Sequence, residues 1–287
     1  MVEPKRYFGL HITRTGGTSL SDLAVRILGR PKCLLLSSFT QMQDDHEQTP
    51  QERGLDPLPL FSFGHYVHES LWGLLLHRGP VYSFAVFREP RKRIQSTIRH
   101  LLSLGMSPDG VRESLAPYPN PTCIEILRCV PVARLLYRDE PPHRQALAAL
   151  SAFTRVETID ELPALIGDLM AQWETPGFEI GQLNAVEARD EEARVKGFES
   201  DEFIGEDLLL WDLLQQPGWR INGSKVTSAI LDLYSDSGAA AELFRMHLDR
   251  YMSRELAMLG TLAEYVTGLK VRRAELSRLI ARLEFPQ

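Results

Sequence analysis

Short apolar runs alternate with longer segments of helical periodicity along most of the 287-residue chain. The run Val81–Phe87 is almost continuously apolar, as in a strand buried on both faces of a parallel sheet. The segment Ser19–Leu28 instead repeats its apolar residues at helical spacing. Strands that alternate with helices predict an α/β fold with a mostly parallel sheet. The predicted strands are Tyr7–Ile12, Cys33–Leu36, Phe61–Gly64, Val81–Phe87 and Ala152–Val156.

Helices are predicted between these strands and throughout the C-terminal quarter. Prolines break the segment Pro108–Pro121, and polar composition predicts long loops at Phe39–Pro59 and Gly177–Gly205. We expect Asp160 near the N-cap of the helix after the fifth strand, and the amphipathic tail segment Val271–Leu283 to cap the core rather than bind a membrane or partner. The predicted helices are Ser19–Leu28, His68–His77, Arg91–Leu104, Cys123–Leu136, His143–Leu150, Ile159–Trp173 and Glu206–Leu214, followed by a helix-rich tail, Val226–Glu284.

Composition narrows the class of protein. Hydrophobic residues make up 44% and charged residues 24%, which are ordinary values for a globular chain. The net charge of −6 gives no overall attraction to nucleic acid or acidic membranes, so any polyanion requires a local basic patch. Three cysteines form neither a disulfide framework nor a zinc pattern. With no apolar signal core and no transmembrane run, we expect a cytoplasmic protein.

Glycines and hydroxyl side chains separate the first predicted strand from the first predicted helix. Gly16 and Gly17 allow the backbone to approach an anion, and the helix start offers N–H groups and a positive dipole end. Arg14 adds a permanent positive charge. Because no Gly-Lys-[Ser/Thr] is present, an ordinary ATP- or GTP-hydrolysing loop is not expected; a plain turn with Thr18 or Ser19 as a cap remains an alternative. The predicted phosphate-binding residues are Arg14, Thr15, Gly16, Gly17, Thr18 and Ser19.

A second basic element follows the buried run Val81–Phe87. Arg88 stands where that strand ends, which is the usual ligand edge of an open parallel sheet, and Ser96 follows on the next helix. An arginine and a hydroxyl can hold a second phosphate through charge-assisted hydrogen bonds. The charge run Arg91, Lys92 and Arg99 is expected to be a solvated helix face.

These two elements resemble the binding motifs of a known family. The stretch Phe8–Leu20, FGLHITRTGGTSL, is similar to the 5′-phosphosulfate loop of carbohydrate-type sulfotransferases and their bacterial relatives. The stretch Arg88–Ser96 is similar to their 3′-phosphate motif, R-x-P-x-x-R-x-x-S. Weaker similarities follow at Phe63-Gly64-His65, Phe153–Thr158, Leu183-Asn184 and Glu206–Trp211. The resemblance implies a P-loop-like sulfotransferase domain over residues 1–216, with a helix-rich extension over residues 217–287 packed on it.

The resemblance also implies site residues. The Arg14–Ser19 loop would hold the 5′-phosphosulfate of 3′-phosphoadenosine 5′-phosphosulfate, and Arg88 and Ser96 its 3′-phosphate, with no metal. His65 would be the general base, since the ordinary histidine pKa near 6.5 suits proton abstraction at neutral pH. His68 is the second choice, Glu69 is a third, and we expect His11 to be structural. The family usually has lysine at the position of Arg14, where it is held to stabilise the bridging oxygen and the transferring sulfate. Because arginine keeps the positive charge, the resemblance implies a catalytic role for Arg14 as well.

Two other functions remain open from the sequence. A kinase-like phosphotransferase would need a magnesium-binding carboxylate near the loop, which the sequence does not present convincingly. The chain could also bind a nucleotide or a sulfated ligand without turnover. For the sulfotransferase, the acceptor would be a hydroxyl of a carbohydrate or a small molecule, and the sequence carries no sign of an oligomeric state.

Overall fold

The computed structural model describes residues 5–36, 58–65, 67–103, 105–175, 195, 197–221, 223–244 and 246–247. By its internal contacts the chain divides into two compact units, Met1–Phe244 and Arg245–Gln287. Every element below belongs to the first unit. The predicted loop Phe39–Pro59 lies almost wholly outside the described residues, and the amphipathic segment Val271–Leu283 lies wholly outside them.

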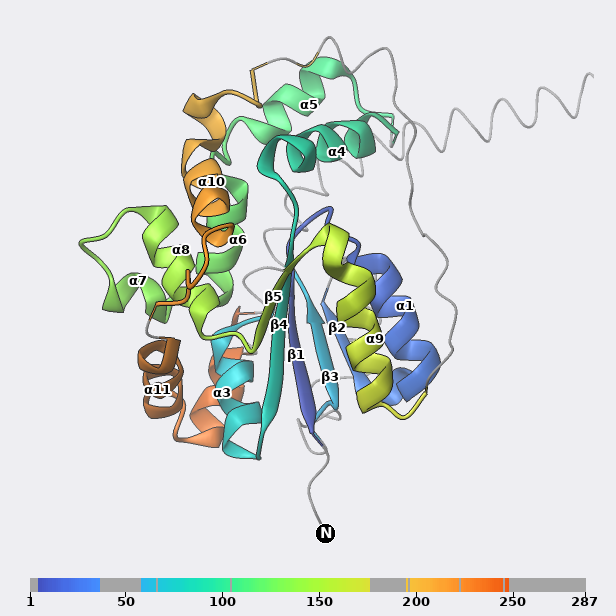
Figure 1. Cartoon of the computed structure of the whole chain (residues 1–287), viewed down its shortest axis with the longest axis vertical. Coiled ribbons are helices and arrows are strands. Elements are labelled where there is room, and N and C mark those ends of the chain that lie inside the picture. Colours follow the sequence, from blue (N-terminus) through green and yellow to red (C-terminus); the bar gives the residue numbers. More distant parts are fainter. Residues whose placement is uncertain are drawn as a thin grey trace, which may run out of the picture. The chain divides into compact units, whose positions relative to one another are not determined.

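A five-stranded parallel sheet forms the centre of the first unit (Figure 1). Its order is β2-β3-β1-β4-β5, and every neighbouring pair is parallel. This confirms the predicted α/β class. The central strand β1 therefore has β3 on one side and β4 on the other. The strands are β1 (Arg6–His11), β2 (Cys33–Leu36), β3 (Phe61–Gly64), β4 (Val81–Phe87) and β5 (Arg155–Thr158).

The first four strands match their predicted ranges within one residue, because burial on both faces makes each of them apolar. The fifth strand is displaced from the predicted Ala152–Val156. It is an edge strand whose four residues are only partly buried, and two of them are the ion-paired Arg155 and Glu157. The apolar signal before it comes from Phe153, which packs on Trp72 away from the strand.

Two helices, α1 (Gly17–Leu28) and α9 (Leu162–Gln172), cover one face of the sheet (Figure 1). Their buried side chains and the inward residues of four strands form one apolar cluster. Short 3₁₀ turns, Arg30–Lys32 and Ile159–Glu161, precede β2 and α9. The cluster includes Leu20, Leu23 and Ala24 of α1 and Leu165, Leu169 and Met170 of α9.

The opposite face is covered by a group of helices that pack on α3 and on one another. Phe8 of β1 stacks on Trp72 of α3 with ring centroids 5.0 Å apart. This group confirms that helices flank the sheet on both faces, and it includes α11, which lies beyond residue 216. Its members are α3 (Glu69–His77), α6 (Pro121–Cys129), α7 (Val132–Leu136), α8 (Pro142–Ser151) and α11 (Gly223–Leu233).

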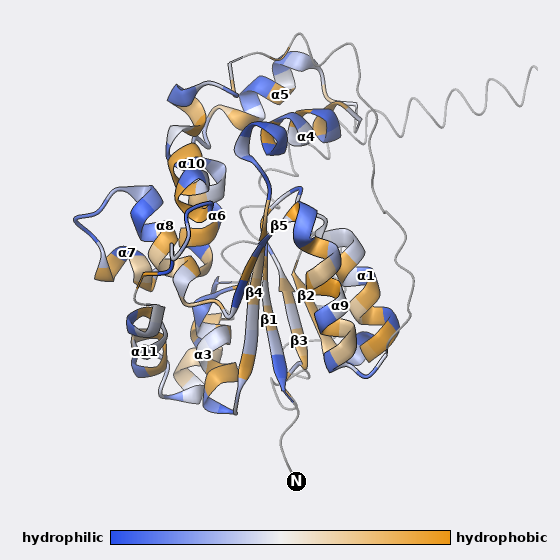
Figure 2. Cartoon of the chain, viewed as in Figure 1, coloured by the Kyte–Doolittle hydropathy of each residue, from blue (hydrophilic) through white to orange (hydrophobic). Residues whose placement is uncertain are grey.

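A third group, beyond the carboxyl edge of the sheet, contains α4 (Pro90–Ser103), α5 (Pro108–Leu115) and α10 (Asp201–Leu214). The prediction that prolines leave 108–121 broken is wrong for α5. Pro108 occupies the first helical turn, where its missing N–H is not needed, and the Ser107 hydroxyl accepts a hydrogen bond from Gly110 N–H (3.1 Å). Figure 2 shows the β4–α4 connection and the start of α4 as strongly hydrophilic.

The helical segment after β5 begins at Ile159 as predicted, with Asp160 near its N-cap Thr158, but its first three residues form the 3₁₀ turn. The N–H and hydroxyl of Thr158 donate to the Glu161 carboxylate at 2.9 and 3.0 Å, in a capping box. Helix α10 begins at Asp201, inside the predicted loop, and has a non-helical residue at Ile204. No helix in the described part of the chain is both long enough and apolar enough to cross a membrane.

Candidate functional site

Three neighbouring strands deliver the predicted site residues to one edge of the sheet. Leu10 near the end of β1 pairs with Gly64 of β3 and with Ala85 of β4. The glycine-containing loop follows β1, His65 follows β3, and Arg88 follows β4. The carboxyl edge of an open parallel sheet is where such folds bind ligands. The fold therefore brings three elements that are distant in the sequence to the place where a ligand is expected.

The loop Thr13–Ser19 requires a left-handed backbone at two residues. Gly16 has φ 81°, and an added Cβ would lie 2.6 Å from Leu162 Cδ2. Arg14 has φ 70°, which for a side-chain-bearing residue costs on the order of 1–3 kcal/mol. Thr15 is almost fully buried, and its hydroxyl donates to the Ile12 carbonyl (2.7 Å). That hydroxyl shapes the loop, and a further role for Thr15 in binding stays a prediction.

Helix α1 begins immediately after the left-handed glycine. Gly16 is its N-cap, and no side chain caps the helix there. A Cβ on Gly17 would lie 2.0 Å from His11 Nε2, so only glycine allows the imidazole to pack against the helix start. Thr18 is exposed and Ser19 partly exposed in the first turn. A helix start of this kind presents N–H groups and a positive dipole end to an anion.

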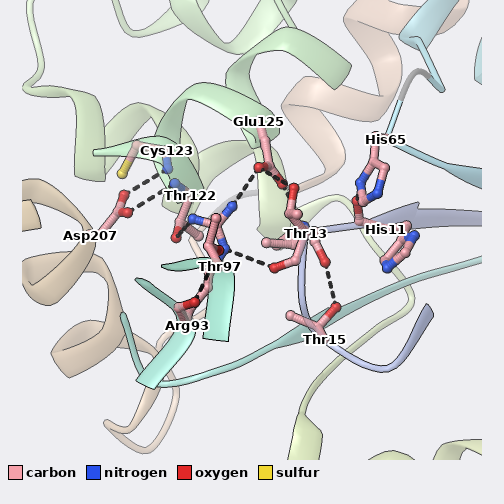
Figure 3. Close-up of polar contacts among 11 residues, drawn as sticks. His11, Thr13, Thr15, His65, Arg93, Thr97, Thr122, Cys123, Glu125 and Asp207 are labelled. Carbon is pink, nitrogen blue, oxygen red and sulfur yellow. Dashed lines mark hydrogen bonds and ion pairs between the residues drawn. The ribbon is translucent and has the colours of Figure 1, made fainter. Parts of the chain in front are cut away.

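A buried ion pair fixes the beginning of the loop (Figure 3). The Glu125 carboxylate accepts from Thr13 N–H (2.8 Å) and from the Thr13 hydroxyl (2.6 Å), and it pairs with Arg93. Arg93, only 2% exposed, also donates through Nε to the Thr13 carbonyl (3.0 Å). Burial raises the Glu125 pKa, but Arg93, His65 and the Thr13 hydrogen bond together hold it below its usual value. Both backbone polar groups of Thr13 are therefore held by one charged pair.

The helix that carries Glu125 is itself held at its start. Asp207 of α10 accepts from Thr122 N–H (2.9 Å) and Cys123 N–H (2.8 Å), the first donors of α6. In return, the Asn120 side chain accepts from Glu206 N–H (2.9 Å) and, more weakly, from Asp207 N–H (3.3 Å). Asp207 thus caps α6, and Asn120 binds the N–H groups that follow the non-helical residue Ile204 within α10, so these contacts link the helix that carries Glu125 to α10.

A cluster of positive charge joins the two basic elements predicted from the sequence. Arg14 Nε lies 3.3 Å from Ser96 Oγ and donates to it, which brings the loop against α4. The pKa values of Arg14 and Arg88 are both lowered, first by burial and then by a neighbouring arginine: Arg88 acts on Arg14, and Arg99 acts on Arg88. Asp160 and Glu89 act on the Arg88 pKa in the opposite direction, but it remains below its ordinary value. The arrangement suits a multiply charged anion.

The remaining basic residues of α4 divide between surface and site. Arg91 and Lys92 are exposed, as predicted, and Arg91 pairs with Asp201 (2.8 Å). The Glu89 carboxylate accepts from the N–H groups of these two residues, at 3.0 and 2.8 Å, and caps the helix. The prediction that Arg99 lies on a solvated helix face is wrong. The Arg99 side chain is partly buried, and its charge lowers the pKa of Arg88.

His65 lies beside the Thr13–Ser19 loop in a stack with His11 (Figure 3). The two ring centroids are 4.0 Å apart, and His65 Nδ1 lies 2.5 Å from the His11 carbonyl oxygen. Burial lowers the His65 pKa, while Glu125 and the His11 carbonyl act in the opposite direction. His65 is therefore neutral at pH 7, the form in which an imidazole can accept a proton.

The two other base candidates have structural contacts instead. His68 is the N-cap of α3 and accepts from Ser70 N–H (3.2 Å), and burial lowers its pKa to about 4. Glu69 is 3% exposed and accepts from Val132 N–H (2.8 Å) and the Tyr234 hydroxyl (2.9 Å). Burial raises the Glu69 pKa to about 7. These contacts tie α3 to α7 and to the end of α11, and they favour His65 as the base.

The described residues include no group of side chains that could bind a metal ion. No three of their His, Cys, Asp and Glu side chains are grouped so that they could hold a metal ion. Cys33, Cys123 and Cys129 are all buried and carry thiols rather than disulfides. Burial raises the pKa of the Cys123 and Cys129 thiols, so neither is an activated nucleophile.

Sequence reasoning missed the residues that support the loop. Thr13 and Asp207 lie within two stretches that resemble the family, Phe8–Leu20 and Glu206–Trp211, but the resemblance gave them no supporting role, and Glu125 stands in no motif. Glu125 is one carboxylate in a predicted helix, and its partner Arg93 lies 32 residues away. The only signal was a charged residue among the apolar residues of Cys123–Leu136. Asn184, noted for its resemblance to a family loop, lies outside the described residues.

Comparison of the sequence with protein-family models and with curated proteins gives no match. The function of the chain must therefore be argued mainly from the geometry of the site.

Proposed function

We propose that this chain is a sulfotransferase on a P-loop-like domain. It would move a sulfuryl group from 3′-phosphoadenosine 5′-phosphosulfate to an acceptor hydroxyl. The observation that supports this most is the contact between Arg14 and Ser96, because it joins the glycine loop and the second basic element into one cationic site. A donor with phosphates at both its 5′ and 3′ positions needs two such elements close together.

The two halves of the site suit the two halves of the donor. The start of α1, with Gly16, Gly17, Thr18 and Ser19, offers backbone N–H groups and hydroxyls to the 5′-phosphosulfate. Arg88 and Ser96 suit the 3′-phosphate, which carries close to two negative charges at neutral pH. Arg14 lies between these halves and can serve either. Arg88 lowers the pKa of Arg14 and Arg99 lowers the pKa of Arg88, and a bound anion would offset this repulsion between like charges.

The transfer would be an in-line displacement at sulfur. His65 takes the proton of the acceptor hydroxyl, and the acceptor oxygen forms a bond to sulfur as the bond from sulfur to the bridging phosphate oxygen breaks. The products are a sulfate ester, 3′-phosphoadenosine 5′-phosphate and the proton on His65. Charge developing on the phosphate is stabilised by Arg14 and by the α1 start. Arginine suffices at position 14, because the leaving phosphate needs a cation and no proton.

The acceptor class follows from the resemblance more than from the described residues. We propose a hydroxyl of a carbohydrate or small molecule as the acceptor. We also propose that the extension over residues 217–287 packs on the sulfotransferase domain. Within that extension, α11 packs against α3 and α8.

The proposal is tested by donor turnover. The purified full chain is incubated with the donor and a panel of sugar and small-molecule hydroxyls, and sulfate esters and 3′-phosphoadenosine 5′-phosphate are measured by mass spectrometry. Removing a charge-assisted contact costs about 1.5–3 kcal/mol, so Arg88→Gln should lower kcat/KM about tenfold to a hundredfold. Arg91→Gln, an exposed arginine three residues along, is the matched control and should retain activity.

Two results would change the assignment. Nucleotide binding without donor consumption over the whole panel would make the protein a binding domain without turnover. Equal losses in Arg88→Gln and Arg91→Gln would place the donor elsewhere.

A further inference from the structure

The His11 side chain lies at the junction of three parts of the site. It is 6% exposed, and its ring stacks on His65 on one side (4.0 Å, 23°) and on Phe63 on the other (5.1 Å, 13°). Its Nε2 packs against the start of α1 at Gly17. The same residue gives its carbonyl oxygen to His65 Nδ1. One residue therefore joins the proposed base to the start of α1.

The hydrogen bond determines which nitrogen of His65 carries the proton. A carbonyl oxygen can only accept, so His65 Nδ1 must be the N–H donor. In a neutral imidazole the other nitrogen, Nε2, then carries the lone pair. The stack with His11 limits rotation of the ring about its Cβ–Cγ bond, which would break this hydrogen bond. Ring orientation and tautomer are thus both set by His11.

We infer that His11 is a positioning residue, which holds His65 as the Nδ1–H tautomer with Nε2 as the basic nitrogen. It also fixes the position of the His65 ring relative to the start of α1. The catalytic part of this inference rests on the proposed function; the tautomer part does not. His11 itself contacts no reacting atom. Because its ring fills the space beside Gly17, a change in the loop and a change in the base are coupled through one side chain.

The charged groups around His65 are compatible with this role. The ring faces Glu125 and Arg128 of α6, Arg93 of α4 and the His11 imidazole of β1. Burial lowers the His11 pKa well below its ordinary value, with His65, Arg14 and Arg93 adding to the effect. His11 thus stays neutral when His65 gains a proton, so the stack does not bring two positive charges together.

The test begins with the unmodified protein. Nitrogen-15 NMR of the histidine-labelled full chain, without nucleotide, reports the tautomer of His65 directly. The inference predicts a single neutral tautomer at pH 7 with the proton on Nδ1. A proton on Nε2, or a mixture of the two tautomers, would overturn it. This measurement needs no donor and no activity, so its result is independent of whether the proposed function holds.

The second step removes the stacking ring. In His11→Leu the carbonyl of residue 11 remains, but the ring that limits rotation of His65 is lost, so His65 should turn away from the carbonyl and populate both neutral tautomers. The value of kcat should fall about tenfold or more, and KM for the donor should change by less than about threefold, because a misaligned base affects the chemical step and not donor binding. The acid limb of the pH–kcat profile should also move, which a general loss of packing would not cause.

Phe61→Leu is the matched control. Phe61 is a fully buried ring on the same strand as Phe63, and it packs on Phe63, Phe84 and Trp173 away from the histidine pair. It should lose comparable stability while the His65 tautomer and kcat remain as in the unmodified protein. Equal effects of the two substitutions on tautomer and kcat would show that His11 contributes only packing. If the protein fails to bind nucleotide while His65 shows the expected tautomer, the proposed function falls and the positioning role stands.

Discussion

The ion pair of Arg93 and Glu125 is the residue-level feature on which the candidate site depends. Both side chains are almost fully buried, and between them they bind the N–H, carbonyl and hydroxyl of Thr13. A buried pair contributes little net stability, but removing one partner leaves an uncompensated charge. Arg93, which belongs to the second basic motif, therefore supports the loop from within the core rather than contacting a ligand at the surface.

A double-mutant cycle tests this role. Glu125→Leu leaves Arg93 without its partner, so it should lower the free energy of unfolding by about 3–5 kcal/mol. Adding Arg93→Met removes the unpaired charge and should recover much of that loss. Denaturant unfolding of the two single variants and the double variant measures the coupling. A loss below about 1 kcal/mol for Glu125→Leu, or strictly additive losses, would mean that the pair does not act as a unit.

At the scale of elements, the start of α1 depends on two adjacent glycines for different reasons. Gly16 is needed for its left-handed backbone, and Gly17 for the approach of the His11 ring. The sequence alone indicated glycines that let a backbone approach a phosphate. The structure adds that Gly17 also admits a side chain from the strand before it.

Alanine substitution separates these effects from general helix propensity. In Gly17→Ala the new Cβ would lie 2.0 Å from His11 Nε2, so we expect a loss of about 1–3 kcal/mol from overpacking, together with weaker nucleotide binding. Gly167→Ala in α9 meets no atom within 4 Å and should stabilise the protein by about 0.5–1 kcal/mol. Thermal unfolding compares the two. A neutral Gly17→Ala would show that His11 moves away without cost.

Elements buried on both faces could be predicted from the sequence, and elements defined by single polar contacts could not. Val81–Phe87 is apolar along its length because both faces of β4 are covered. The edge strand β5 has no such apolar run, so the sequence predicts a strand around the apolar Phe153, which precedes β5. Helix α5 depends on a Ser107 cap that offsets its proline, and α10 begins within a polar stretch.

The candidate site divides in the same way. Glycines, arginines and a histidine that are proposed to contact a ligand carry short-range patterns, so Arg14, Arg88 and His65 could be found from the sequence. The residues that hold them in place are brought together only by the fold. Glu125 meets Thr13 across 112 residues, and Asp207 meets Thr122 across 85. No local spacing encodes such pairs, and the contact of Arg14 with Ser96 is of the same kind.

At the scale of the whole molecule, we propose that the carboxyl ends of β1 and β4 form one site for a nucleotide with phosphates at both the 5′ and 3′ positions. The sheet order places β4 directly beside β1, so the Thr13–Ser19 loop and Arg88 leave the sheet next to each other. Two basic elements side by side suit a nucleotide that carries phosphates at two separate positions.

The most direct measurement is a calorimetric titration of the full chain with 3′-phosphoadenosine 5′-phosphate and with adenosine 5′-monophosphate, which differ by one phosphate. We expect the unmodified protein to prefer the first ligand by about tenfold to a hundredfold, which is the contribution of one charge-assisted contact. In Arg88→Gln this preference should fall to within a few-fold, while the affinity for the monophosphate stays unchanged. Equal affinity of the unmodified protein for the two ligands would contradict the account, because the second basic element would then bind no 3′-phosphate.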